Sequence, residues 1–129
     1  MSEELGEFKV SNDILDDPIK IRERMNDEGY LFFKALQDQD QLHSLRKDML
    51  NVISNGGWLQ PGFDSIEGVA DISKRCTEGD PEYPDVYHDV YKLESFHRAA
   101  HSSIVLDAMG KIIGSPVLPH PQKIERLWF

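Results

Sequence analysis

The last twenty residues, Gly110 to Phe129, constrain the fold of this 129-residue chain more than any other stretch. An apolar helix is expected to end at Gly114, because glycine takes the left-handed conformation of a helix cap at little cost. The three prolines within residues 116–121 then exclude helix and predict an extended path. The chain closes on a strand-like run, KIERLWF, which would be an aggregation hazard if unpaired. We therefore expect this run to be tucked into the domain or to continue into a longer protein; an exposed strand here would favour self-association.

Length and charge limit the class of protein. A chain of 129 residues is one domain or part of one. Its net charge of −9 would repel phosphate backbones and anionic membrane surfaces, so neither nucleic acid nor a membrane is an expected partner. No apolar run approaches the length of a membrane span, and the N-terminus lacks the basic and apolar regions of a signal peptide. A single cysteine, Cys76, fits a cytoplasmic location.

The first half of the chain alternates helix signals with one apolar run. Residues 1–12 are predicted to be a loose tail, and residues 13–129 a single incomplete domain. The sequence Asp16-Asp17-Pro18 is typical of a helix start, and Gly29 of its end. Residues 30–33, all apolar, predict a short strand buried on both faces. An amphipathic helix beginning near residue 38 or 40 is predicted to end at 55–57, Asn-Gly-Gly.

The second half begins with an irregular stretch. From Trp58 to about residue 91 the sequence keeps neither a period of two nor one of 3.6, and it contains three prolines. It predicts a long loop with one short helix near residues 66–73, and loops of this length are usually functional or disordered. Tyr83, Tyr87 and Tyr91 argue against disorder. Two further helices are expected, one starting around Lys92 and one over residues 104–113.

The residue types of metal and nucleophilic sites are few. His97 and His101 lie four residues apart, so they would share one face of a helix, as metal ligands can. The alternative is a pair of polar residues at a helix surface. His88 and Asp89 are adjacent and would point to opposite faces of a strand, so they do not form the His-x-Asp half of an iron site. Arg75 could lower the pKa of Cys76, but no partner base is identifiable, which favours an incidental thiol.

In the terminal run, strand alternation groups Ile124, Arg126 and Trp128 on one side. A charge between isoleucine and tryptophan is costly to bury unless it meets a partner. If that face lines a barrel interior, Arg126 could meet a carboxylate of a substrate, of 2-oxoglutarate or of a structural Asp or Glu. A structural salt bridge at the strand's edge is the alternative.

Two segments of the chain carry a family resemblance: 27–50, DEGYLFFKALQDQDQLHSLRKDML, and 96–129, FHRAAHSSIVLDAMGKIIGSPVLPHPQKIERLWF. The first resembles the opening of the phytanoyl-CoA dioxygenase family, a Gly-Tyr strand followed by an amphipathic helix. The second resembles the stretch just upstream of that family's iron site. Members are Fe(II)- and 2-oxoglutarate-dependent dioxygenases. The resemblance implies an α+β fold, in which several helices and a few strands form the N-terminal part of a double-stranded β-helix of the jelly-roll or cupin kind.

The resemblance also implies cofactor-binding residues and an incomplete site. The family's terminal strand contributes to the wall of the 2-oxoglutarate pocket, which implies Arg126 and Trp128 as cofactor-binding candidates. The family's His-x-Asp, second iron histidine and 2-oxoglutarate-binding arginine would all follow Phe129, and this sequence has none of them. The chain is thus expected to be an inactive hydroxylase fragment with no catalytic or metal-binding residue. Iron, 2-oxoglutarate and a small-molecule substrate are implied for the full-length relative.

Two other functions remain open. One is a self-contained acidic binding module without catalysis, in which the tyrosine-bearing loop and the acidic surface recognise a small basic partner. The other is a small metal-binding protein that uses His97, His101 and a carboxylate from the loop.

Overall fold

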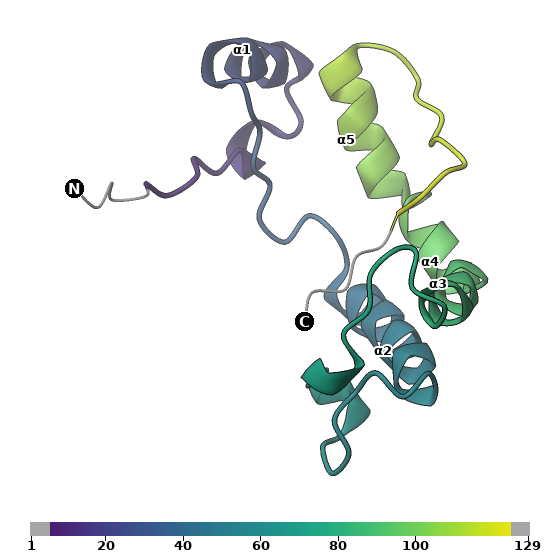
Figure 1. Ribbon diagram of the computed structural model, residues 1–129. Coiled ribbons are helices and arrows are strands. Elements are labelled where there is room, and N and C mark those ends of the chain that lie inside the picture. The colour runs from purple at the N-terminus through teal and green to yellow at the C-terminus, as the bar shows by residue number, and fades with distance from the viewer. Residues whose placement is uncertain (1–5, 125–129) are drawn as a thin grey trace. The chain divides into compact units, whose positions relative to one another are not determined.

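A computed structural model describes residues 6–124 of the chain (Figure 1). These residues fall into two compact units. The first unit contains residues 6–38 and 102–119, and the second contains residues 39–101 and 120–124. The predicted single domain over residues 13–129 stays a prediction. No helix within the described residues is long and apolar enough to cross a membrane.

Two α-helices and one 3-10 turn form the first unit: η1 (Asn12–Ile14), α1 (Pro18–Glu28) and α5 (Ser103–Ile113). The Asp17 side chain caps α1 by accepting hydrogen bonds from the backbone N–H groups of Ile19 and Lys20, both at 3.1 Å. Gly29 and Gly114 take the left-handed conformation, with φ of 76° and 84°, and end α1 and α5. Both helix ends therefore lie where the sequence predicts them.

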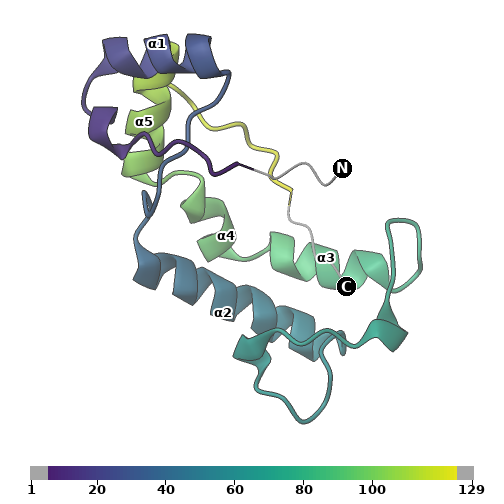
Figure 2. The ribbon, with the colours of Figure 1, turned by 90° about the vertical axis from the view of Figure 1, so that its left-hand side faces the viewer.

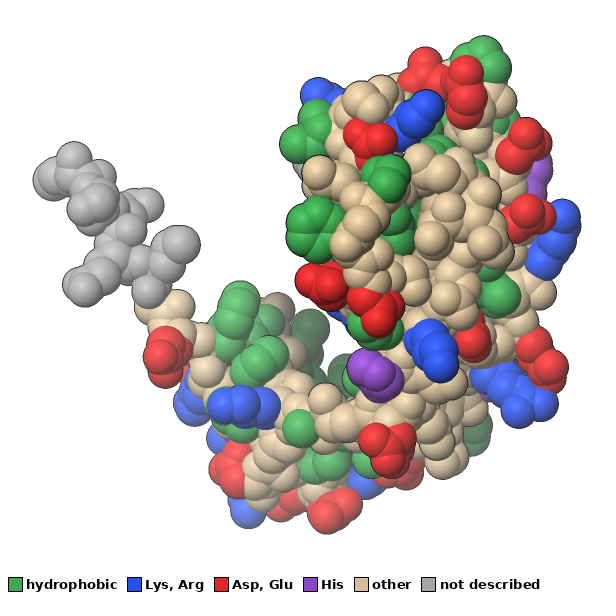
Figure 3. Space-filling model, turned by 90° about the horizontal axis from the view of Figure 1, so that it is seen from below, with side chains coloured by type: hydrophobic (Ala, Val, Ile, Leu, Met, Phe, Trp, Pro, Cys, Tyr) green, Lys and Arg blue, Asp and Glu red, His purple; other side chains and the backbone are tan. Residues whose placement is uncertain are grey.

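The core of the first unit is small. Among its described residues the buried hydrophobic ones are Ile14, Ile21 and Ala108, and Ile21 is fully buried. Many large hydrophobic side chains remain exposed in this unit, including Phe8, Ile19 and Leu118. Figure 3 shows exposed hydrophobic side chains among charged ones in a space-filling view. Apolar packing in the first unit therefore depends on a few residues.

The apolar run 30–33 is extended, but it forms no strand of a sheet. Val10 and Phe32 make one isolated parallel bridge, in which the Ser11 N–H donates to the Phe32 carbonyl at 2.8 Å. The Phe8 ring packs edge-on against Tyr30 at a centroid distance of 5.3 Å. Phe32 is 38% exposed, so the predicted burial on both faces is wrong.

The second unit contains α2 (Gln39–Asn55), α3 (Tyr83–Tyr91) and α4 (Glu94–Ala99), with 3-10 turns η2 (Ser65–Glu67) and η3 (Ile72–Lys74). Helix α2 lies along both α3 and α4 (Figure 2). Between these elements lies a cluster of buried side chains: Leu50, Ile53, Trp58, Val86 and Val90. The apolar stripe of α2 thus finds its partner in a helix that the sequence did not predict.

The α+β prediction is wrong for the part of the chain that the structure describes. Every named element from residue 6 to residue 124 is helical, and β pairing is limited to the isolated bridges Val10–Phe32 and Leu59–Ala70. A strand needs a partner along its length, and Ala35, at a φ of 54°, lies in the turn that follows the run 30–33. The predicted jelly-roll architecture is therefore wrong for residues 6–124.

The predicted loop from residue 58 to residue 91 is also corrected. Its last nine residues form α3, with Pro84 in the first turn, where proline has no N–H to lose. Val86 and Val90 then face α2 at helical spacing. The prolines therefore mark a helix start and do not exclude the helix. The remainder of the stretch is irregular, apart from the short turns η2 and η3.

Candidate functional site

The two cofactor-binding candidates of the sequence, Arg126 and Trp128, lie outside the described residues, as does most of the terminal run. Their predicted place in a 2-oxoglutarate pocket stays a prediction. The same holds for self-association through this run.

The paired histidines are engaged with the backbone. His97 Nε2 hydrogen-bonds to the Tyr91 carbonyl at 2.7 Å, and His101 Nδ1 to the His97 carbonyl at 2.9 Å. The described residues contain no group of three or more His, Cys, Asp or Glu side chains that could hold a metal ion. These hydrogen bonds favour the second of the two interpretations, polar residues that hold α4 in place.

Cys76 has a poor environment for a nucleophile. Burial raises the pKa of its thiol, and the negative charges of Asp80 and Glu82 raise that pKa further. The pKa of Cys76 is thus raised and not lowered, and burial is the larger cause. The finding agrees with an incidental free thiol.

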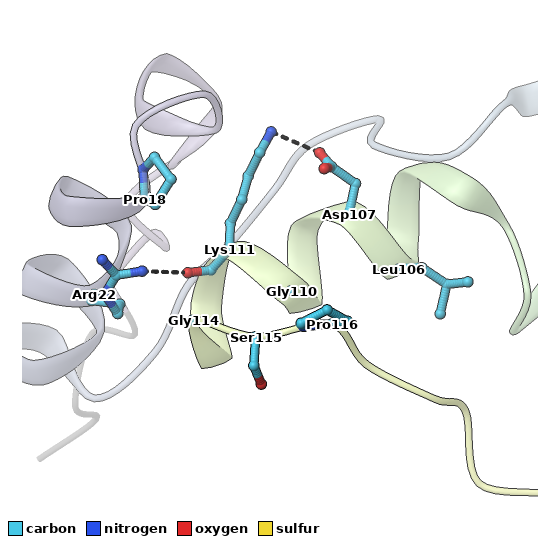
Figure 4. A pocket seen from close by; sticks show the side chains of 9 residues that line it. All are labelled: Pro18, Arg22, Leu106, Asp107, Gly110, Lys111, Gly114, Ser115 and Pro116. Carbon is cyan, nitrogen blue, oxygen red and sulfur yellow. Dashed lines mark hydrogen bonds and ion pairs between the residues drawn. The ribbon is translucent and has the colours of Figure 1, made fainter.

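One cavity, of about 450 Å³, lies in the first unit between α1 and the end of α5 (Figure 4). The Arg22 guanidinium donates to the Lys111 carbonyl at 3.0 Å. Lys111 Nζ meets Asp107 at 2.7 Å and Asp16 at 3.1 Å. Hydrogen bonds to Asp107 and Asp16 raise the pKa of Lys111, which stays charged. The hydrogen bond from Arg22 and the ion pair with Asp16 connect α5 to α1 and to the residues before it. The carboxylates of Asp16 and Asp107 balance the charges of Arg22 and Lys111, so little positive charge is left for an anionic ligand.

A second cavity, of about 540 Å³, lies in the second unit beside α3. We call it the tyrosine cavity. Tyr83 and Tyr87 line it, one turn apart on α3, with ring centroids 5.4 Å apart and planes 22° apart. Tyr91 continues the same stack at 6.3 Å from Tyr87, and Trp58 flanks Tyr83 at the same distance. The other described residues of the wall are Glu78, Gly79, Pro84, His88, Gln122 and Ile124.

The chain around the tyrosine cavity is acidic. Between Cys76 and Tyr91 the sequence has five Asp or Glu residues and no Lys or Arg. Two of the acids are engaged locally: Asp80 accepts from the Thr77 N–H at 2.6 Å, and Asp89 pairs with Lys92 at 2.8 Å. The other three, Glu78, Glu82 and Asp85, form no ion pair with a residue between 6 and 124. The α3 side of the cavity therefore carries an excess of negative side chains, whereas Lys123 lies between the lining residues Gln122 and Ile124 on the other side.

The sequence analysis places Tyr83, Tyr87 and Tyr91 in a loop and does not predict that they share one cavity. Their spacing of four residues was the signal, because residues four apart share a face of a helix. Gln122 and Ile124 could not be assigned to the same wall, since more than thirty residues separate them from His88.

No family model, no curated protein and no solved structure matches this sequence. The family, the hydroxylase activity and the cofactors expected from the sequence accordingly stay predictions.

Proposed function

We propose that this chain is the helical N-terminal portion of a hydroxylase that resembles the phytanoyl-CoA dioxygenase family, and that it carries no catalytic group itself. In the full-length protein, iron and 2-oxoglutarate would serve the hydroxylation of a small molecule. The residues that hold them would lie downstream of Phe129.

One local feature supports this proposal. The resembled opening of the family is a Gly-Tyr strand followed by an amphipathic helix. In this chain, α1 ends at Gly29, the run 30–33 is extended and bridged once to Val10, and the 17-residue helix α2 follows. The order of these elements agrees with the resembled order, although a single bridge takes the place of the strand.

Sequencing the gene beyond the codon for Phe129 is the first test. An open frame that soon encodes His-x-Asp is the expected result. The full product should then decarboxylate 2-oxoglutarate in an iron-dependent manner, and the 129-residue chain should not. A stop codon directly after Phe129, or a full product that shows no iron-dependent turnover with any hydroxylatable substrate, would contradict the proposal.

A second function, a binding module for a basic partner, is favoured by the tyrosine cavity and its acidic surroundings. Opposite charge accelerates association and suppresses wrong partners, so an acidic site selects cationic ligands. The test is titration calorimetry of the chain with a short lysine-rich peptide and with its glutamate-rich counterpart. Binding of the lysine-rich peptide alone, weakened by added salt, is expected. Equal binding of both peptides, or of neither, would contradict this role.

A further inference from the structure

We infer that the tyrosine cavity binds a small organic ammonium ion, with Tyr83 and Tyr87 as its aromatic wall and Glu78 as its counter-charge. This inference rests on the binding role given above as the second function and names the ligand class of that site.

The wall of the cavity selects the charge of the ligand. Among the lining residues between 6 and 124 there is one carboxylate, Glu78, and neither lysine nor arginine. Glu78 would repel an anion and attract an ammonium ion, and no lysine or arginine among the described lining residues opposes it. Glu82 and Asp85 lie between lining residues along the chain and add negative charge beside the cavity, against the single cation Lys123 between Gln122 and Ile124.

The pKa of Cys76 is raised chiefly by burial, and the same acids beside the cavity, Asp80 and Glu82, raise it further. Asp80 and Glu82 disfavour the thiolate, as a negative field does for any anion. The same field favours a cation.

The two rings select an organic cation over a metal ion. Tyrosine rings attract ammonium groups and pack against their alkyl substituents. Because Tyr83 and Tyr87 stack on one helix face, the wall exists before the ligand arrives, and little side-chain entropy is lost on binding. Calcium would need six or more oxygen ligands, and the lining residues offer one carboxylate. A volume of about 540 Å³ lies within the range of small-molecule sites.

Choline and 3,3-dimethylbutan-1-ol form a matched pair of probes, because the second molecule replaces the ammonium nitrogen of choline by carbon. We expect choline to bind the intact chain with a dissociation constant on the order of 1 mM, as suits one carboxylate and a half-exposed aromatic wall. The neutral analogue should bind at least about fivefold more weakly, since a cation–aromatic contact and one counter-charge together contribute about 1 kcal/mol. Nuclear magnetic resonance titration of the tyrosine ring signals measures both.

Variants assign the binding to this cavity. Tyr87→Leu removes a ring of the wall and should weaken choline binding several-fold, whereas Tyr87→Phe keeps the ring and should retain it. Glu78→Gln should weaken binding, whereas Asp40→Asn, which changes the net charge equally on α2, should not. Circular dichroism of each variant checks that the helices are intact.

Equal affinity for the two probes would overturn the inference, as would equal effects of Glu78→Gln and Asp40→Asn with the fold intact. If the lysine-rich peptide binds and choline does not, the binding role stands and the ammonium site is wrong. If neither binds, both are wrong.

Discussion

The two units of this chain are stabilised in different ways. In the second unit, α2 and α3 enclose a cluster of five buried hydrophobic residues. In the described part of the first unit three hydrophobic residues are buried, and several caps and ion pairs connect its elements. These contacts include the Asp17 cap, the Lys9–Glu28 ion pair at 2.7 Å and the Lys111–Asp107 ion pair at 2.7 Å.

This difference implies different sensitivities. Burial of apolar surface is insensitive to pH and salt, whereas exposed ion pairs and caps weaken with salt and with protonation. Truncation of a buried side chain should therefore affect the second unit strongly, and acid should affect the first unit before the second.

The largest effect is expected from Leu50→Ala. Leu50 belongs to the buried cluster at 8% exposure, so truncation leaves a cavity and should lower the free energy of unfolding of the second unit by about 2–5 kcal/mol. Leu42→Ala is the matched control on the same helix. Because Leu42 is 37% exposed, its truncation should lower the free energy of unfolding much less. Urea denaturation followed by circular dichroism measures both. Equal losses would show that the cluster does not hold the unit together.

The next effect is expected from Gly56→Ala, just after the end of α2. A β-carbon at this position would overlap the Val86 side chain of α3, which belongs to the buried cluster. Overpacking of this kind should destabilise the second unit by about 1–3 kcal/mol. Combining Gly56→Ala with Val86→Ala makes room, so the double variant should lose less than the sum of the two single losses in urea denaturation. Additive losses would mean that the contact is absent.

A smaller effect is expected from Asp17→Ala in the first unit. The Lys20 backbone N–H and the Lys20 ammonium hold the pKa of Asp17 below its usual value of 3.8. The contribution of this cap to the free energy of unfolding is thus fully present above pH 3.8. It is lost as the pH falls through the lower pKa that Asp17 has in the folded protein. Amide hydrogen exchange in α1 should accelerate in Asp17→Ala at neutral pH. Asp17→Asn should keep most of the protection, because asparagine is also a good cap, and should lose its acid dependence. Equal exchange in all three proteins would exclude the cap as a stabiliser.

Local chemistry made the helix ends predictable. Asp17 with Pro18 at the start of α1, and Gly29 and Gly114 at two ends, act through their own backbone geometry, which the sequence states directly. Helix α2 was predictable for a similar reason, since its apolar stripe has the helical period.

Features that depend on contacts between distant parts of the chain could not be predicted. The run 30–33 has strand composition, but whether it becomes a strand depends on partners elsewhere in the chain. Helix α3 was not predicted because Pro81, Pro84 and several acidic residues suggested a loop. Val86 and Val90, four residues apart and both buried, have the helical spacing. The tyrosine cavity combines residues of α3 with Gln122 and Ile124, and no local pattern joins them.

The smallest effect is expected from Ser11→Ala, and its sign is informative. Ser11 is fully buried, and its hydroxyl oxygen has no hydrogen-bond partner among residues 6–124. A buried hydroxyl without a partner costs free energy, so its removal should leave the first unit as stable as before or stabilise it by up to about 1 kcal/mol. The backbone bond from the Ser11 N–H to Phe32 is retained in alanine. Ser11→Val tests the space around the side chain and should destabilise by overpacking. A loss of stability in Ser11→Ala, measured by hydrogen exchange in α1, would mean that an ordered water satisfies the hydroxyl, and that a polar contact stabilises even the most buried position of this unit.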